Sequence, residues 1–414
     1  MSVMLSAPRG TQDVLPSQSG KWQFVEETAR KTAALFGFRE IRFPTFEHTE
    51  LFCRGVGDTT DVVQKEMYTF TDRSGESLTL RPEGTAGVAR ALIENKKFSD
   101  TMPIKLYYII NCFRHEAPQA GRFREFEQFG VELFGSASAA ADADIISLAN
   151  SIIKNLGIED VSLRINSIGC PNCRGGHRSA LREYFSSCRD ELCDTCKTRL
   201  ETNPMRILDC KSEICKKFAE NAPKTIDYLC DDCKAHMDLL ESCLKEKGIE
   251  YTVDTSIVRG LDYYSRTVFE FVCGSIGAQS TICGGGRYDG LVSELDGPAT
   301  PACGFGMGIS RLLPAAKVPE IDNSPAVYIA SMGEAAAVKA SGLASKLRDK
   351  GVYAECDLVG RSLKAQMKYA DKIGAKYTVI IGDSELECGR AQLRSMADSS
   401  QNEIEIDKIV EFFN

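Results

Sequence analysis

The sequence lacks any hydrophobic run long enough to cross a membrane. A membrane-spanning helix needs about 20 consecutive apolar residues, and no stretch of the 414 residues approaches that length. The first residues, MSVMLSAPRGTQD, also lack the long apolar segment of a secretory signal. Internal repeats and low-complexity segments are missing as well. We therefore expect a globular, cytoplasmic protein with no membrane partner.

An excess of positive charge is also missing. The chain has 50 lysines and arginines against 58 aspartates and glutamates, which gives a formal net charge of −8 and a pI near 5.4. This balance excludes a protein that simply coats nucleic acid, so an RNA partner would need a local basic patch. Hydrophobic residues make up 43% of the chain, enough for a core. At roughly 150 residues per domain, the length predicts two or three domains.

Cysteine, by contrast, is abundant. The chain has 17 cysteines, an odd number in a protein too long to depend on disulfides. Ten of them fall between residues 170 and 243, which suggests a separate module.

Two pairs in this module, CPNC (170–173) and CDTC (193–196), have the spacing of a four-cysteine zinc site. A third pair, CDDC (230–233), and two further cysteines at 210 and 215 offer additional ligands. No histidine joins the pairs at ligand spacing, which argues against a catalytic zinc. The candidate ligands of a structural zinc are Cys170, Cys173, Cys193 and Cys196. The alternative is a set of buried, reduced thiols.

Hydrophobic periodicity divides the chain into a β-rich core, a helical insertion and a small α/β domain. A helix is predicted over 17–36 after a serine N-cap, strand-like runs follow from 38 to 134, and 141–155 is helical. Beyond a linker at 317–325, strands and helices alternate. The expected divisions are 1–168 and 251–324 for the two parts of the core, 169–250 for the Cys-rich helical insertion and 325–414 for the last domain.

Two strand-like runs joined by the loop APQAGRF (117–123) carry the most informative pattern. Side chains alternate along a strand, so Arg114 and Glu116 share a face on the first run. On the second run the residues that share a face are Phe126, Gln128, Gly130 and Glu132. A strand face that carries an aromatic ring, an amide, a glycine and a carboxylate suits neither the solvent-exposed surface nor an apolar core. It suits the floor of a binding pocket. The alternative is a solvated face of an antiparallel sheet.

Glycine-rich segments add signs of an anion site. In ACGFGMGISRL (302–312) three glycines at a period of two leave one strand face bare, so that a planar ligand can lie against the backbone. Arg311 follows in the first turn of a helix, where a positive charge is unfavourable unless an anion is near. No GxGxxG or P-loop pattern is present. A nucleotide would therefore be held by arginines and a sheet.

Taken together, these segments resemble the class II aminoacyl-tRNA synthetases, and specifically the bacterial histidyl-tRNA synthetases, over nearly the whole chain. The matching segments are PRGTQD (8–13), REIRFPTFE (39–47) as the dimer-forming motif 1, RPEGTAG (81–87), FRHEAPQAGRFREF (113–126) as motif 2, RGLDYY (259–264), GGGRYDGL (284–291) and GFGMGISRL (304–312) as motif 3. The resemblance implies an α+β fold with an antiparallel catalytic sheet flanked by helices, and an anticodon-binding domain at 325–414. It also implies a homodimer that joins histidine to its tRNA with ATP and Mg²⁺.

The resemblance assigns a role to each matching position. The residues expected to bind histidine are Glu83, Gly84, Thr85, Arg114, Gln128, Glu132, Arg259, Tyr263, Tyr264 and Tyr288. The residues expected to bind ATP are Arg114, Glu116, Arg122, Phe126 and Arg311. Arg114 and Arg259 are the expected catalytic residues, because they would flank the α-phosphate. Glu132 and Tyr264 would hydrogen-bond the imidazole, and no protein ligand for a catalytic metal is expected.

Some positions leave tRNA recognition open. Ala117 stands where many members of the family have an arginine, and Glu127 replaces a common histidine. The predicted helix 361–373 carries a basic stripe that either contacts the anticodon or is a solvated face. The stripe consists of Arg361, Lys364, Lys368 and Lys372.

Two other functions remain as alternatives. One is the synthetase-like regulatory subunit of ATP phosphoribosyltransferase, which typically lacks the C-terminal domain and parts of the histidine signatures. The other is a non-catalytic, zinc-scaffolded RNA-binding module, which leaves the arginines around the bare sheet unexplained.

Overall fold

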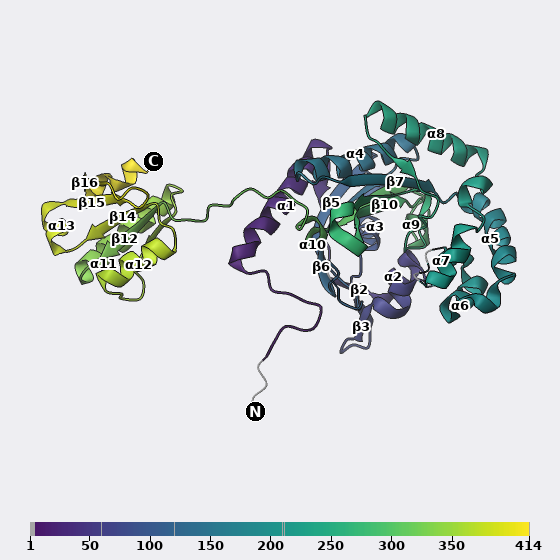
Figure 1. The fold of residues 1–414 in the computed structure, drawn as a ribbon, viewed down its shortest axis with the longest axis horizontal. Helices are drawn as coiled ribbons and strands as arrows, with labels where there is room; N and C mark the ends of the chain where they lie inside the picture. The colour runs from purple at the N-terminus through teal and green to yellow at the C-terminus, as the bar shows by residue number, and fades with distance from the viewer. Residues whose placement is uncertain (1–4, 59, 120, 209, 211, 414) are drawn as a thin grey trace. The chain divides into compact units, whose positions relative to one another are not determined.

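The computed structural model describes residues 5–58, 60–119, 121–208, 210 and 212–413. Residues 1–4, part of the segment that was expected to carry no secretory signal, and Ala120 in the motif 2 loop lie outside the described residues. The chain forms two compact units, Met1–Pro319 and Glu320–Asn414 (Figure 1). Among the described residues, no helix is both long and apolar enough to cross a membrane.

An eight-stranded sheet forms the centre of the first unit, in the order β1-β5-β6-β11-β10-β9-β7-β8. Only the outermost pairs, β1 with β5 and β7 with β8, are parallel. The strands are β1 (Arg39–Glu40), β5 (Ile104–Phe113), β6 (Glu125–Phe134), β7 (Val161–Ser167), β8 (Thr252–Val253), β9 (Ser265–Cys273), β10 (Thr281–Arg287) and β11 (Ala302–Gly308). The predicted α+β class with an antiparallel sheet core is confirmed.

Helices cover both faces of this sheet. The helices of the core are α1 (Pro16–Leu35), α2 (Thr49–Val56), α3 (Thr85–Glu94), α4 (Ala139–Asn155), α9 (Leu291–Glu294) and α10 (Ile309–Leu312). Helices α1 and α4 bury Val25 and Ile145 in a core shared with Phe269 and Phe305 of the sheet. The serine cap predicted for the first helix is wrong: Leu15 is the N-cap, and Pro16 occupies the first turn, which suits its fixed φ.

A small sheet and several short turns complete the core. The sheet, in the order β2-β4-β3, consists of β2 (Phe46–His48), β3 (Tyr68–Thr71) and β4 (Ser77–Leu80). The short 3₁₀ and π-helical segments among the described residues are η1 (Val62–Glu66), η2 (Lys97–Ser99), η3 (Arg189–Glu191), η4 (Pro204–Ile207), η5 (Thr225–Tyr228), η6 (Gly274–Gln279) and η7 (Ile406–Lys408).

The Cys-rich segment between β7 and β8 is helical. Its helices are α5 (Pro171–Ser186), α6 (Asp194–Thr202), α7 (Glu213–Glu220) and α8 (Asp231–Glu246), drawn in teal in Figure 1. Part of it has a core of its own, in which Leu181, Phe185 and Ile207 are fully buried. Helix α8 instead packs on α4, where Leu240 and Leu244 join the core of the catalytic sheet.

The second unit is a five-stranded sheet with helices. Its strands, in the order β13-β12-β14-β15-β16, are β12 (Val327–Ser331), β13 (Ala354–Cys356), β14 (Tyr377–Ile381), β15 (Arg390–Ser395) and β16 (Gln401–Glu405). Its helices are α11 (Glu334–Asp349), α12 (Leu363–Lys372), α13 (Asp383–Cys388) and α14 (Ile409–Phe412). The strands β13, β12 and β14 are parallel, so this unit is α/β in character.

A buried ionic network joins the insertion to the catalytic sheet. Asp142 on α4 accepts hydrogen bonds from Arg287 Nη2 (2.6 Å) and His236 Nε2 (2.6 Å), and both Asp142 and Arg287 are essentially inaccessible to solvent. Burial alone would raise the pKa of Asp142, but the hydrogen bond from His236 and the charge of Arg287 lower it below its ordinary value. The network thereby links α4, α8 and β10.

We expect Asp142→Asn to lower the free energy of unfolding by about 3–5 kcal/mol, because it leaves the buried Arg287 with only the partly exposed Asp289 as a counter-ion. The pKa of Asp142 is depressed in the folded state. This contribution is therefore present above the ordinary aspartate pKa of about 3.9 and is lost as the pH falls through the folded value. Urea unfolding followed by the fluorescence of Trp22, the only tryptophan, reports on the first unit.

The matched control is Asp144→Asn on the same helix. Asp144 makes a partly exposed ion pair with Lys105 (3.1 Å), and removing such a pair costs less than about 1 kcal/mol. Equal losses in the two variants would contradict a special role for the buried network.

Candidate active site

One cavity of about 530 Å³ collects most of the predicted ligands. Twelve of the fourteen line it: Glu83, Thr85, Arg114, Glu116, Arg122, Phe126, Gln128, Arg259, Tyr263, Tyr264, Tyr288 and Arg311. Gly84 and Glu132 are not among the lining residues, and Glu132 lies buried beneath the wall. Arg114 and Glu116 lie just beyond the end of β5, which stops at Phe113, and not on the strand as predicted.

Glycines in β10 and β11 make room for polar side chains against the sheet. A Cβ on Gly284 would collide with the guanidinium of Arg259, and one on Gly306 would collide with the amide of Gln128. The bare face predicted for β11 is present. However, Gln128 and Glu132 of this chain cover the bare positions at Gly306 and Gly304, so the face is not simply an open floor for a ligand.

Three hydroxyl groups enclose the carboxyl of Glu132. It accepts hydrogen bonds from Thr85 Oγ1 (2.8 Å), from Tyr108 OH (2.9 Å) and from the hydroxyl of Tyr288. Burial raises the pKa of Glu132 to about 8, although these hydrogen bonds act in the opposite direction. Glu132 is therefore largely protonated at neutral pH. Tyr264, which is expected to bind the imidazole together with Glu132, is not one of the three hydroxyl donors to Glu132.

Tyrosine rings form one wall of the cavity. The ring centroids of Tyr263 and Tyr264 lie 4.7 Å apart, and those of Tyr263 and Tyr288 lie 5.4 Å apart. Tyr263 OH also reaches Thr85 Oγ1 at 3.5 Å. The wall presents hydroxyl groups and ring edges to a ligand, which suits a small aromatic heterocycle.

The next wall is strongly cationic. Burial lowers the pKa of Arg311, and the nearby charges of Arg122, Arg114 and Arg259 lower it further. Within the described part of the chain, the buried Nε atoms of Arg122 and Arg259 have no hydrogen-bond partner. Arginines crowded in this way are stabilised by a bound anion, so this wall fits a polyphosphate.

Arg259 is held in an unusual backbone conformation. Its φ of 58° lies in the left-handed region, which is uncommon for a residue other than glycine. Its guanidinium forms an ion pair with Glu270, and its carbonyl accepts a hydrogen bond from Arg206 Nη1 (3.4 Å). Strained backbone of this kind concentrates at functional sites.

Four of the five expected ATP ligands contact one another in pairs. Glu116 Oε2 pairs with Arg122 Nη1 at 2.7 Å, and the guanidinium of Arg114 lies 5.5 Å from the ring centre of Phe126. Arg114 Nε also donates to the carbonyl of Pro82 at 2.8 Å.

Glu83, one of the expected histidine ligands, accepts hydrogen bonds from the backbone N–H groups of the first two residues of α3, and burial raises its pKa.

Sequence reasoning missed Tyr108, Glu270 and Arg206. Tyr108 fills the space over Gly84 and Gly130, where a Cβ would collide with its ring. Arg206, in the insertion, donates to Asp262 Oδ1 at 2.8 Å and so contacts the RGLDYY segment. No local pattern distinguishes these three residues, because each acquires its role through a partner distant in the sequence.

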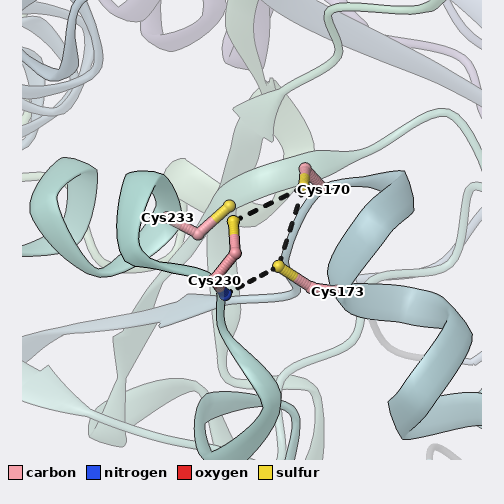
Figure 2. Close-up of side chains that lie close together, drawn as sticks. All are labelled: Cys170, Cys173, Cys230 and Cys233. Atoms are coloured by element: carbon pink, nitrogen blue, oxygen red, sulfur yellow. Dashed lines mark hydrogen bonds between the residues drawn. The ribbon is translucent and has the colours of Figure 1, made fainter.

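The cysteine module contains two four-cysteine groups, and the grouping predicted from the sequence is wrong. One group consists of Cys170, Cys173, Cys230 and Cys233, as Figure 2 shows, and the other of Cys193, Cys196, Cys210 and Cys215. The two pairs expected to share one site belong to different groups, because the fold sets the start of α8, and not the start of α6, beside the start of α5.

Comparison with known proteins agrees with the geometry. The family model described as histidyl-tRNA synthetase matches residues 10–171 and 190–312, and the model of an anticodon binding domain matches 326–414. The chain belongs to the histidyl-tRNA synthetase family. The family predicted from the motifs is thereby confirmed.

Individual relatives cover nearly the whole chain. The histidine–tRNA ligase of Caldanaerobacter subterraneus subsp. tengcongensis is 52% identical over 411 residues, 98% of this chain and 99% of that protein. The histidine–tRNA ligase of Acetivibrio thermocellus is 52% identical over 413 residues, 99% of each chain. The solved structure of apo histidyl-tRNA synthetase from S. aureus has a TM-score of 0.84 at 38% identity, covering 99% of this chain and all of that one.

We expect Glu132→Gln to remove a pH dependence from the free energy of unfolding. Between the ordinary glutamate value of 4.5 and about 8, the folded chain holds a proton on Glu132 that the unfolded chain has released. The stability of the wild type therefore falls as the pH rises through this interval. The variant cannot ionise, so its stability relative to the wild type should improve with pH, by at most about 1.4 kcal/mol per pH unit.

Urea unfolding of both proteins across this interval, followed by Trp22 fluorescence, measures the difference. The control is Gln128→Asn, a change on the same face of β6 that leaves no ionisable group in either form, and its curve should run parallel to the wild type. Parallel curves for Glu132→Gln as well would show that Glu132 is ionised in the folded chain.

Proposed function

We propose that the cavity binds histidine and ATP side by side, and that the chain converts them to histidyl adenylate and pyrophosphate before transferring histidine to the 3′ end of its tRNA. The observation that carries this proposal is a single cavity in which the tyrosine wall, with the hydroxyl-enclosed carboxyl of Glu132 buried behind it, adjoins the arginine wall. The first suits an imidazole, and the second suits a polyphosphate.

Histidine would be held at both of its ends. Glu83, Thr85 and Gln128 would bind the α-amino group, and Glu132 with the tyrosine wall would bind the imidazole. A buried polar group left unpaired by a different side chain is costly, and sites that hydrogen-bond a substrate group discriminate by up to about 10⁴–10⁵. Because three hydroxyl groups donate to Glu132, the imidazole would reach it by replacing or extending one of these hydrogen bonds.

ATP would occupy the cationic wall. Glu116 and Phe126 would contact adenine, Arg114 and Arg259 would flank the α-phosphate, and the outer phosphates would meet the remaining two arginines, Arg122 and Arg311. The pair between Glu116 and Arg122 would separate when ATP binds, which frees the carboxylate for the adenine amino group and the guanidinium for phosphate.

The chemistry then needs positioning and charge neutralisation. A carboxylate oxygen of histidine attacks the α-phosphorus, and the bond from that phosphorus to the pyrophosphate oxygen breaks. No general base is required because the carboxylate is already ionised. Arg114 and Arg259 neutralise charge that develops at the α-phosphate. Mg²⁺ bound with ATP would stabilise the departing pyrophosphate, and no protein ligand is expected for it.

The second unit would bind the anticodon stem of the tRNA. Helix α12 begins after Arg361, the first residue of the predicted stripe, and exposes its three lysines, Lys364, Lys368 and Lys372. Arg361 is instead held by Asp357 (2.8 Å) and lies over the ring of Tyr369. The proposed phosphate contacts are therefore the three lysines.

We also propose a homodimer formed through the motif 1 segment, and a cytoplasmic location, where tRNA is charged for protein synthesis. Two aromatic side chains in this region, Phe46 and Phe70, contact each other and are 52% and 44% exposed. Such side chains are commonly covered in a subunit interface.

The regulatory-subunit alternative has less support. A solved structure described as an ATP phosphoribosyltransferase regulatory subunit/histidyl-tRNA synthetase from Bacillus halodurans is 26% identical with a TM-score of 0.67. The present chain keeps both the arginine wall and the C-terminal unit, which the alternative does not need.

We expect Arg259→His to lower histidine-dependent ATP–pyrophosphate exchange at least about 100-fold, because it removes a charge contact to the α-phosphate in the transition state. The loss should fall mainly on kcat and less on the KM for histidine. The measurement is exchange of labelled pyrophosphate into ATP, with Trp22 fluorescence as a check on folding.

The matched control is Arg54→His on α2. Arg54 pairs with Asp296 (2.8 Å) at the surface, away from the cavity lining, and exchange by this variant should stay within about twofold of the wild type, the scale of losing a surface ion pair. Near-normal exchange by Arg259→His would overturn the role proposed for Arg259.

A further inference from the structure

We propose that the helical insertion binds two structural zinc ions, one in each four-cysteine group. The group at its base, called the root site, consists of Cys170, Cys173, Cys230 and Cys233. The group within its own core, called the outer site, consists of Cys193, Cys196, Cys210 and Cys215. This proposal does not depend on the proposed ligase chemistry, because metal content is measured without a substrate.

The sulfur positions fit tetrahedral coordination. Four sulfurs at about 2.3 Å from a zinc ion lie roughly 3.8 Å from one another. In the root site Cys170 Sγ lies 3.6 Å from Cys173 Sγ and 3.9 Å from Cys230 Sγ. In the outer site Cys193 Sγ lies 3.8 Å from Cys210 Sγ. These separations are far longer than a disulfide bond of about 2.05 Å.

All four sulfurs of each group face one centre. The ligand atoms of each group lie within 4.8 Å of one another. Figure 2 shows the four root-site side chains pointing toward one another from the starts of α5 and α8. Four thiols that merely fill a core have no reason to converge on a single point, whereas four metal ligands must do so.

Helix N-termini favour the ionised thiolates that a zinc ion needs. Cys170, Cys193 and Cys230 are the N-cap residues of α5, α6 and α8. In each of these CxxC pairs the second cysteine falls in the first helical turn, near the positive end of the helix dipole. This environment stabilises a thiolate. Cys230 N donates to Cys173 Sγ at 3.1 Å, and Cys193 N to Cys215 Sγ at 3.4 Å, as outer-shell donors to metal-bound sulfur do.

The root site lies where the insertion meets the wall of the cavity. It joins the start of α5, which directly follows β7, to the start of α8, 60 residues later along the chain. Arg174, in the first turns of α5, donates to the carbonyl of Tyr264 in the tyrosine wall. A metal ion here would fix the start of α5, and with it this contact.

The outer site ties together a segment with little apolar material. Helices α6 and α7 have only nine and eight residues, and helices of this length are marginal on their own. The same segment carries Arg206, which contacts Asp262 and the carbonyl of Arg259. A second metal ion would hold this short segment in a fixed conformation beside the cavity.

The test is metal analysis of the full chain, purified without chelator from cells grown with added zinc. We expect two equivalents of zinc per chain and no iron or inorganic sulfide. Cys233→Ser should remove one equivalent through the root site, and Cys215→Ser should remove one through the outer site. The matched control is Cys243→Ser, a change in α8 outside both groups, which should keep both equivalents.

If a variant does not fold, the wild-type chain still gives an answer. Replacement of its zinc by cobalt(II) should produce thiolate charge-transfer bands and the visible bands of tetrahedral coordination, at an intensity that corresponds to two ions. Less than about one equivalent of any metal, with the thiols free to alkylation, would overturn the proposal in favour of buried thiols. One equivalent that only one of the two variants removes would overturn it for the other site, and bound iron would overturn the assignment to zinc.

Discussion

Asp142 is a buried carboxylate whose pKa the hydrogen bond from His236 and the charge of Arg287 hold below its ordinary value, and Thr267 donates a further hydrogen bond to it. Much of the first unit is organised about these contacts. Arg287 ends β10, and the next residue along the chain, Tyr288, turns to the opposite side and hydrogen-bonds Glu132. The same carboxylate reaches α8 of the insertion through His236. One buried charge thus fixes a strand end, an inserted helix and a tyrosine of the candidate histidine pocket.

The site depends on a second constraint, which is the absence of side chains at chosen positions. Gly284 leaves room for Arg259, and Gly130 leaves room for Tyr108. The register of the sheet sets both positions: Tyr108 lies directly opposite Gly130, and Glu270, the ion-pair partner of Arg259, lies directly opposite Gly284. The cationic Arg259 can therefore lie close to the backbone in one part of the site, and the neutral Tyr108 can do so in the other. The two parts of the site differ in charge as a result.

The sequence pattern predicted the features that depend only on neighbouring residues, such as the direction of side chains along a strand. The alternation at 126–132 predicted a shared face on β6, and the glycines at 304–308 predicted a bare one, because side-chain direction in a strand depends on parity alone. The sequence could not show that Tyr108 would enclose Glu132, that Glu270 would pair with Arg259, or that Arg206 would reach the site. It also misassigned the cysteines, since spacing defines each CxxC pair but only the packing of α5 against the start of α8 decides which pairs meet. Family resemblance supplied the roles that neither periodicity nor spacing contains.

Glu132, enclosed by hydroxyl groups behind the tyrosine wall, and the adjoining arginine wall are proposed to form one site for histidine and ATP. The decisive measurement is ATP–pyrophosphate exchange with each of the twenty amino acids in turn. We expect exchange with histidine and background exchange with the other nineteen. Comparable exchange with several amino acids, or none with histidine from a folded chain, would contradict this proposal.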